Sequence, residues 1–337
     1  MLVIPALFGT EILDEEQGTI WGTFGCLYRG PKIGVLEGLR GRPGKVMSGI
    51  PILAGWKYDI SGALQAALCT SGYRAGETLH LFAYDWRLAV MEVGRKLVAE
   101  IRALAARTGS DVDLLGLSNG GLLLLAAFAI DPGLPVQRVV TSGSPLGGSI
   151  ETLACLNAGF RFAPFGRVVS PEEFAACAGS TDSIPRPDVA SFVDPGYDLY
   201  DVETWKKLRM SVFRHAQNLD DPVWNRVMTE RLAATHATWK TISRAPAPRR
   251  LVCVVGAGLP TQVRIVVKDG KALIPGEGHL RRLPAAALAD GDGGVSFVSA
   301  TAWEAADPQI IRIPVTRHRD VVRTPDAFRA ILQALRD

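Results

Sequence analysis

Short apolar runs alternate with amphipathic and glycine-rich segments along the chain. The apolar runs predict buried strands at residues 2–7, 79–84, 113–115, 137–142, 250–255 and 310–315. Helical spacing predicts a helix at 93–104, a segment that is apolar all round predicts a buried helix at 122–128, and Thr324-Pro325-Asp326 marks the start of a closing helix. Strands that alternate with helices are typical of an α/β fold with a mostly parallel sheet covered on both faces.

Two long segments interrupt this alternation. Residues 11–60 contain many glycines and prolines with interspersed aromatic residues, and we expect an irregular, lid-like excursion there. Residues 151–247 are rich in helix formers and aromatic residues, which predicts a cap inserted over the C-terminal edge of the sheet, where ligands bind in such folds. Residues 1–150 and 248–337 then form the core, which includes a strand pair around an Asp269-Gly270 turn.

Composition narrows the classes of function. The chain has 337 residues, of which 47% are apolar and 21% charged, enough for a sizeable buried core. Its 37 basic and 34 acidic residues nearly balance, and no basic run with interleaved aromatic residues occurs, so nucleic acid is not an expected partner. We expect neither a metal nor a cofactor for this chain.

The N-terminus and the cysteines bear on location. Met1-Leu2-Val3-Ile4-Pro5 has no basic segment and reads as a strand, so we expect no signal peptide. The longest nearly unbroken apolar stretch, 120–130, is far shorter than the ~20 residues that a membrane span requires. The dispersed cysteines favour free thiols in a reducing compartment, hence a cytoplasmic protein; they are Cys26, Cys69, Cys155, Cys177 and Cys253.

A tight turn between strand and helix supplies a candidate nucleophile. In Gly116-Leu117-Ser118-Asn119-Gly120 the serine has to stand clear of the backbone, and side chains at 116 and 120 would collide there. The turn follows an apolar strand and opens an apolar helix, which is the context expected of a nucleophile elbow. A glycine-rich turn with a capping serine is the alternative interpretation of Ser118.

The candidate base and acid lie far downstream. Asp290-Gly291-Asp292 and then His318 follow Ser118, and the order serine, acid, histidine is that of α/β-hydrolases. Only His318 lies beyond the acid loop; the other histidines are His80, His215, His236 and His279. Asp292 is preferred as the acid because it begins an Asp-Gly-Gly-Val pattern, while Asp290 stays open and either could be a solvated turn residue.

An oxyanion hole requires two backbone N–H groups aimed at the developing negative oxygen. We expect one from Asn119, directly after the nucleophile at the start of a helix. The second is expected from Leu7, in the loop after the first strand.

Several segments together resemble the lecithin:cholesterol acyltransferase family, which includes the lysosomal phospholipase and the phospholipid:diacylglycerol acyltransferases. The segments are Ile4-Pro5-Ala6-Leu7-Phe8-Gly9, Gly72-Tyr73, Ala83-Tyr84-Asp85-Trp86-Arg87, Gly143-Ser144-Pro145-Leu146-Gly147-Gly148-Ser149, Gly256-Ala257-Gly258-Leu259-Pro260-Thr261 and Asp290-Gly291-Asp292. The resemblance implies an α/β-hydrolase fold with Ser118, Asp292 and His318 as a catalytic triad. It also implies acyl transfer from a glycerolipid through an acyl-serine.

The chain departs from the family's pattern near the expected site. The family usually has His where this chain has Leu117, Leu or Met at Asn119, Gly at Ala6 and Thr at Gly294. Asn119 and Ala6 line the expected mouth of the site and bear on the choice of substrate. Cys26 has no nearby partner for the disulfide-closed lid of the animal members, and we expect residues 84–87 to be architectural.

The sequence therefore predicts a serine acyl-hydrolase or acyltransferase that cleaves a glycerolipid ester. The excursion and the cap are candidates for gripping an acyl chain or for peripheral contact with a membrane. A soluble esterase, lactonase or thioesterase acting on a small metabolite is the first alternative. A hydrolase-fold binding protein with a dead site is the second.

Overall fold

The structure is a computed structural model that describes the chain apart from residues 30–40, 54–55, 163–165, 277–279, 315–316 and 337, and for Arg29, Leu53 and Trp56 it describes the backbone alone. Val315, at the end of the last predicted strand, and His279 therefore lie outside the described residues.

A parallel sheet forms the centre of the molecule. Its strands are β1 (Leu2–Ile4), β7 (His80–Leu81), β8 (Val112–Leu117), β9 (Val136–Ser142), β13 (Leu251–Ala257) and β18 (Gln309–Pro314). They lie in the order β18-β13-β9-β8-β1-β7, and each neighbouring pair is parallel. The predicted α/β class with a mostly parallel sheet is confirmed. Strands β1 and β7 are shorter than predicted.

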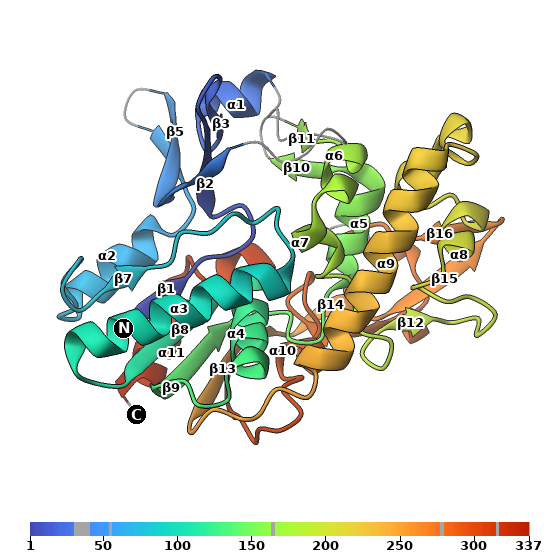
Figure 1. Cartoon of the computed structure of the whole chain (residues 1–337). Coiled ribbons are helices and arrows are strands. Elements are labelled where there is room, and N and C mark those ends of the chain that lie inside the picture. Colours follow the sequence, from blue (N-terminus) through green and yellow to red (C-terminus); the bar gives the residue numbers. More distant parts are fainter. Residues whose placement is uncertain (30–40, 54–55, 163–165, 277–279, 315–316, 337) are drawn as a thin grey trace.

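Helices cover both faces of this sheet. Alternate strand residues point to opposite sides, so that Leu114 packs into one apolar cluster with α3 (Val90–Thr108) and α4 (Asn119–Ile130). Leu115 packs into a second cluster with α2 (Gly62–Thr70) and α11 (Pro325–Arg336). Figure 1 shows α3 and α4 in front of the sheet and α11 behind it. Burial on both faces explains why the strands are continuous apolar runs.

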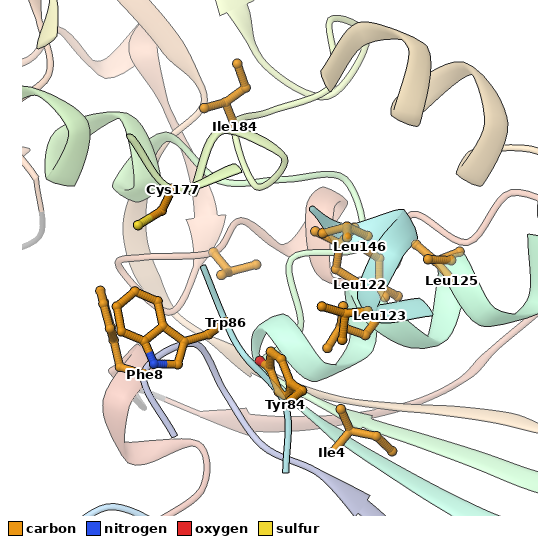
Figure 2. Packing of buried hydrophobic residues seen from close by; sticks show 14 of the residues in the cluster. Ile4, Phe8, Tyr84, Trp86, Leu122, Leu123, Leu125, Leu146, Cys177 and Ile184 are labelled. Atoms are coloured by element: carbon orange, nitrogen blue, oxygen red, sulfur yellow. The ribbon is translucent and has the colours of Figure 1, made fainter. Parts of the chain in front are cut away.

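The two helices predicted from spacing lie where they were expected. The buried residues of α3 include Val93, Leu97, Ile101 and Leu104. Every residue of α4 from Asn119 to Phe128 is buried, because the helix is enclosed by the sheet, α3 and later segments. Figure 2 shows Leu122, Leu123 and Leu125 of α4 within this core.

The excursion differs from the irregular segment that the sequence suggested. It contains β2 (Thr10–Asp14), β3 (Gly18–Trp21), α1 (Phe24–Arg29), β4 (Arg42–Val46), β5 (Gly49–Leu53) and β6 (Trp56–Asp59). The strands form an antiparallel sheet in the order β3-β2-β4 and a β5-β6 hairpin. Each pairing contains a register shift, which breaks the alternation of apolar and polar residues and hides the strands from pattern analysis.

The segment between β9 and β13 is mostly helical. Its elements are α5 (Ile150–Ala158), β10 (Phe160–Phe162), β11 (Gly166–Val169), α6 (Pro171–Ala176), α7 (Ala178–Thr181), β12 (Ser191–Phe192), α8 (Val202–Lys207) and α9 (Pro222–Ile242), with short 3₁₀ turns at Ser211–Arg214 and Ala216–Asn218. In Figure 1 the strands of the excursion (blue) and β10, β11 and α6 (green) lie at the top of the view, above the sheet. The two segments touch where Tyr58 of β6 meets Phe162 of β10, with ring centroids 4.4 Å apart.

The predicted strand pair around Asp269-Gly270 is present as β15 (Arg264–Lys268) and β16 (Lys271–Leu273). Asp269 and Gly270 have φ of 50° and 68°, the left-handed pair of a tight hairpin turn. β15 also pairs with β12, so the hairpin extends the inserted segment. The next elements are β14 (Leu259–Gln262), β17 (Leu288–Gly291), α10 (Phe297–Ala300) and 3₁₀ turns at Leu280–Arg282, Ala285–Ala287 and His318–Asp320.

A buried carboxylate joins the inserted segment to the core. Asp182, just after α7, accepts a hydrogen bond at 2.8 Å from the backbone N–H of Val90, the first residue of α3. Its other oxygen accepts from the hydroxyl of Thr235 on α9 at 3.1 Å. The residue before α3 is Ala89, which has no side chain to cap the helix, so Asp182 supplies the cap from another segment.

Burial raises the pKa of Asp182 above its ordinary value. A carboxyl whose folded pKa is raised contributes stability at low pH that is lost as the pH rises through the folded pKa. The variant Asp182→Asn keeps an oxygen for Val90 and an amide donor for Thr235. We expect its free energy of unfolding to improve relative to the wild type as the pH rises from 4 to 8, as measured by urea unfolding.

Asp182→Ala is the matched comparison, because it removes both hydrogen bonds. We expect it to lower the free energy of unfolding by about 1–3 kcal/mol. If Asp182→Asn instead loses stability relative to the wild type as the pH rises, the assigned role of the carboxylate is wrong.

Candidate active site

Ser118 lies at a strained turn between β8 and α4. Its φ of 48° and ψ of −118° are unusual for a residue with a side chain, and such a conformation costs about 1–3 kcal/mol. The turn is held by hydrogen bonds from Ser118 N–H to the Ser142 carbonyl at 2.9 Å and from Gly121 N–H to the Ser118 carbonyl at 3.0 Å. The conformation lifts the hydroxyl out of line with both the strand and the helix.

Both predicted elbow glycines are required sterically. A Cβ on Gly116 would lie 2.8 Å from the backbone nitrogen of Gly121. A Cβ on Gly120 would lie 2.3 Å from the carbonyl oxygen of Ile4. The second contact shows that the loop after β1 lies directly against the first turn of α4.

The structure brings Ser118, His318 and Asp292 together from three distant parts of the chain. Ser118 Oγ is 3.0 Å from His318 Nε2. His318 Nδ1 is 2.9 Å from Asp292 Oδ2, and the His318 backbone N–H donates to the Asp292 carbonyl at 2.9 Å. The Asp292 side chain is 2% exposed and that of His318 25%, so the acid is buried while the imidazole is partly exposed.

Asp292 is held by its own loop. Its Oδ1 accepts from the backbone N–H groups of Gly294 at 3.0 Å and Val295 at 2.7 Å. This pair of bonds turns Oδ2 toward the imidazole. Gly294, where the family usually has Thr, has its Cβ position 3.0 Å from His318 Cβ, so the missing side chain leaves room for the histidine.

The alternative acid, Asp290, has other partners. Its Oδ1 accepts from the Gly258 backbone N–H at 2.6 Å, and its Oδ2 is 3.8 Å from Arg312 Nη1. Its side chain is also about half exposed. Of the two carboxylates, Asp292 is the one bonded to His318 Nδ1.

The histidines outside this cluster lie elsewhere. His80 Nε2 is 3.0 Å from the Glu77 carbonyl. His215 lies 3.5 Å from Glu172, and His236 stacks on Tyr200 with ring centroids 4.8 Å apart. Each therefore has contacts within its own region.

The two expected oxyanion donors lie on adjoining backbone segments. Asn119 is the first residue of α4, where N–H groups have no acceptor within the helix. Leu7 lies in a turn that the Gly9 N–H closes by bonding to the Ala6 carbonyl at 3.0 Å. Phe8 anchors the turn with a φ of 65° and a ring whose centroid lies 4.6 Å from that of Trp86 (Figure 2). These positions are compatible with two donors at the serine.

The segment at residues 84–87 is buried beside this loop. Asp85 and Arg87 form a two-pronged ion pair, with Nε to Oδ1 at 2.9 Å and Nη2 to Oδ2 at 2.7 Å. The Arg87 carbonyl accepts from Gly179 N–H of α7 at 3.2 Å. These contacts fit the architectural role expected for the segment.

Two side chains that the sequence did not reveal support the acid loop. Thr261 Oγ1 accepts from Gly293 N–H at 2.9 Å. Ser149 Oγ donates to the Gly294 carbonyl at 2.6 Å. Both residues lie in segments that carry the family resemblance. A hydroxyl in a motif, however, does not reveal which distant loop it supports.

Three of the five cysteines do not offer a competing nucleophile. All five are free, and burial raises the pKa of Cys177 to about 12 and that of Cys253 to about 11. Burial also raises the pKa of Cys155. These thiols remain protonated near neutral pH, and only a thiolate is a strong nucleophile.

The described residues contain neither a cluster arranged to hold a metal ion nor a helix suited to span a membrane. No group of three or more His, Cys, Asp or Glu residues is arranged to hold a metal ion within the part of the chain that the structure describes. Among the described helices, none is both long and apolar enough to cross a membrane.

Part of the chain matches a known protein family. The family model described as lecithin:cholesterol acyltransferase matches residues 49–174, which include the elbow. No curated protein sequence matches the chain. The match supports an enzyme of ester hydrolysis or acyl transfer.

Solved structures are similar to the chain to different extents. The crystal structure of the Tle4-Tli4 complex contains a chain with 14% identity and a TM-score of 0.64, with 99% of this chain and 97% of that chain covered. The mature Bacillus licheniformis lipase BlEst2 has 15% identity, a TM-score of 0.43 and coverage of 81% and 83%. The Paleococcus ferrophilus monoacylglycerol lipase has 16% identity, a TM-score of 0.34 and coverage of 76% and 82%. The resemblance to the lecithin:cholesterol acyltransferase family is thus confirmed over residues 49–174, within a chain that has the α/β-hydrolase fold.

Proposed function

We propose that this protein is a serine hydrolase or O-acyltransferase that cleaves a glycerolipid ester through an acyl-serine intermediate. The observation that carries the proposal is the continuous hydrogen-bonded chain from Ser118 through His318 to Asp292, with steps of 3.0 Å and 2.9 Å. A hydroxyl becomes a strong nucleophile only when a base accepts its proton, and here a base stands within reach.

In the first half of the reaction, Ser118 Oγ forms a bond to the ester carbonyl carbon while its proton passes to His318 Nε2. Asp292 Oδ2 accepts a hydrogen bond from Nδ1–H, which holds the imidazole in the tautomer that can act as a base and stabilises the imidazolium that forms; the proton stays on Nδ1. The carbonyl oxygen becomes an alkoxide, and the N–H groups of Leu7 and Asn119 stabilise it.

In the second half, the tetrahedral intermediate expels the alcohol, which takes the proton from His318 Nε2. The acyl group stays on Ser118. Water or an acceptor alcohol then gives its proton to His318 and attacks the acyl carbon, and collapse of the second intermediate returns the proton to Ser118. Hydrolysis and transfer use the same residues and differ only in which hydroxyl reaches the acyl-enzyme.

A lipid substrate is supported by the family match, and apolar aromatic side chains pack beside the expected oxyanion loop. The ring of Phe8 is 4.3 Å from that of Phe160 and 5.0 Å from that of Trp21 between centroids. Peripheral contact with a lipid surface is supported by Tyr28 of α1, which is 76% exposed. The expectation that Asn119 lines the mouth of the site is wrong, because the residue is 4% exposed and its side chain is bonded to Ser183, so its polarity does not favour the small-ester alternative.

The proposal is tested with a fluorophosphonate probe and with glycerolipid vesicles. We expect the wild type to be labelled at Ser118 and to release or transfer acyl chains from the vesicles. Ser118→Ala should abolish labelling and lower kcat by at least roughly 10⁴-fold, because no other group replaces the nucleophile. Turnover of nitrophenyl acetate without any action on vesicles would favour the small-ester alternative, and an unlabelled wild type would favour the dead-site alternative.

The acid is tested by a matched pair of variants in one loop. Asp292→Asn is expected to lower kcat by roughly 10³–10⁴-fold, because an amide in this place favours the wrong imidazole tautomer. Asp290→Asn should keep kcat within about threefold of the wild type, since its carboxylate is bonded to Gly258. Steady-state kinetics on one ester substrate, with thermal unfolding as a check on folding, decide the assignment. Equal losses in the two variants would contradict it.

A further inference from the structure

The residue after the nucleophile is polar and almost fully buried. Asn119 is 4% exposed, and its Oδ1 accepts a hydrogen bond from Ser183 Oγ at 2.9 Å. Ser183 lies after α7 in the inserted segment and is 3% exposed; its hydroxyl is also 3.0 Å from the Gly179 carbonyl. A side chain on the elbow is therefore bonded directly to the segment above it. A Leu or Met at this position would make no such bond.

The other end of the amide meets a buried tyrosine. Tyr84 is 2% exposed, and burial raises the pKa of its hydroxyl, an effect that the neighbouring Asn119 amide partly offsets. Because Asn119 Oδ1 accepts from Ser183, the amide NH₂ is the end of the side chain that can stabilise the tyrosine oxygen. The Tyr84 hydroxyl in turn donates to the Pro5 carbonyl at 3.1 Å. Figure 2 shows Tyr84 beside Ile4 and below the helix that carries Leu123.

The Pro5 carbonyl lies at the start of the turn that presents Leu7. Pro5 has no N–H, so its carbonyl is the backbone group through which a neighbour can hold it. On the other side, the same stretch touches the elbow, since the Cβ position of Gly120 is 2.3 Å from the Ile4 oxygen and 3.1 Å from the Pro5 oxygen. The contacts thus run from Ser183 through Asn119 and Tyr84 to the loop before Leu7, with hydrogen bonds from Ser183 to Asn119 and from Tyr84 to Pro5.

We propose that Asn119, Tyr84 and Ser183 are positioning residues that fix the Leu7 N–H as an oxyanion donor. Through them, the position of this N–H depends on how the inserted segment packs against the core. The inference rests on the proposed function. None of the three side chains is assigned a bond to substrate. Their effect is on the alkoxide, which exists only in the transition state and the tetrahedral intermediates, so it falls on kcat more than on KM.

The test compares Tyr84→Phe, Ser183→Ala and the double variant on one ester substrate. For Tyr84→Phe we expect kcat to fall about 10-fold with KM within twofold, a smaller loss than the 10²–10³ caused by removing an oxyanion donor outright. Affinity for a trifluoromethyl ketone, which forms a tetrahedral adduct with the serine, should fall in parallel with kcat. Ser183→Ala should lose about threefold in kcat, since it acts on the loop through two further side chains.

The double variant separates a series from independent contacts. If the contacts act in series, adding Ser183→Ala to Tyr84→Phe should lower kcat little further, whereas independent effects would multiply. Tyr200→Phe is the matched control: its hydroxyl donates to the Pro185 carbonyl at 2.9 Å, the same kind of bond away from the elbow, and kcat should not change.

Several outcomes overturn the inference. One is an active, folded Tyr84→Phe variant with kcat within twofold of the wild type. Another is a loss that appears in the melting temperature and in KM while kcat and ketone affinity stay unchanged, since that is the pattern of a merely structural contact. A wild type with no turnover and no labelling of Ser118 would overturn the proposed function, and this inference with it.

Discussion

The close approach of two backbones at the elbow is the constraint on which the site depends. Ser118 adopts a positive φ, and Gly120, two residues later, lets the helix touch the Ile4 carbonyl. A Cβ on Gly120 would lie only 2.3 Å from that oxygen. Strain of this kind persists only where the surroundings fix it, and here the parallel strands β1, β8 and β9 do so. One contact therefore places the nucleophile and the loop that carries Leu7 within one rigid unit.

The central part of the fold and the three candidate catalytic residues could be predicted from the sequence because their signals are local. Parallel strands buried on both faces are apolar runs, and Ser118 is marked by two glycines that the turn requires. His318 could be chosen because only one histidine follows the acid loop. Asp292 was harder to choose, since a two-residue shift separates it from Asp290 and only the loop's hydrogen bonds distinguish them.

The remaining features depend on contacts between distant residues. The strands of the excursion are interrupted by register shifts, and β15 joins β12 across more than 70 residues of chain, as its partner pair Ser191 and Arg264 shows. Asp182 caps a helix that begins 92 residues earlier. The periodicity within a segment cannot predict such a pairing, because each residue bonds to a distant partner and not to its neighbours in the sequence. A polar residue in an apolar segment is the one local clue, and Asn119 gave it.

These distant polar contacts share one direction, from the inserted segment to the elements that hold the active site. Asp182 fixes the start of α3, Gly179 bonds to the Arg87 carbonyl, and Ser183 bonds to Asn119. All three lie within one short stretch around α7. A buried polar bond is costly to leave unmade, so displacing this stretch would expose several unsatisfied groups at once. We therefore expect this stretch to keep one position relative to the core. One position for α7 implies one geometry for the loop after β1.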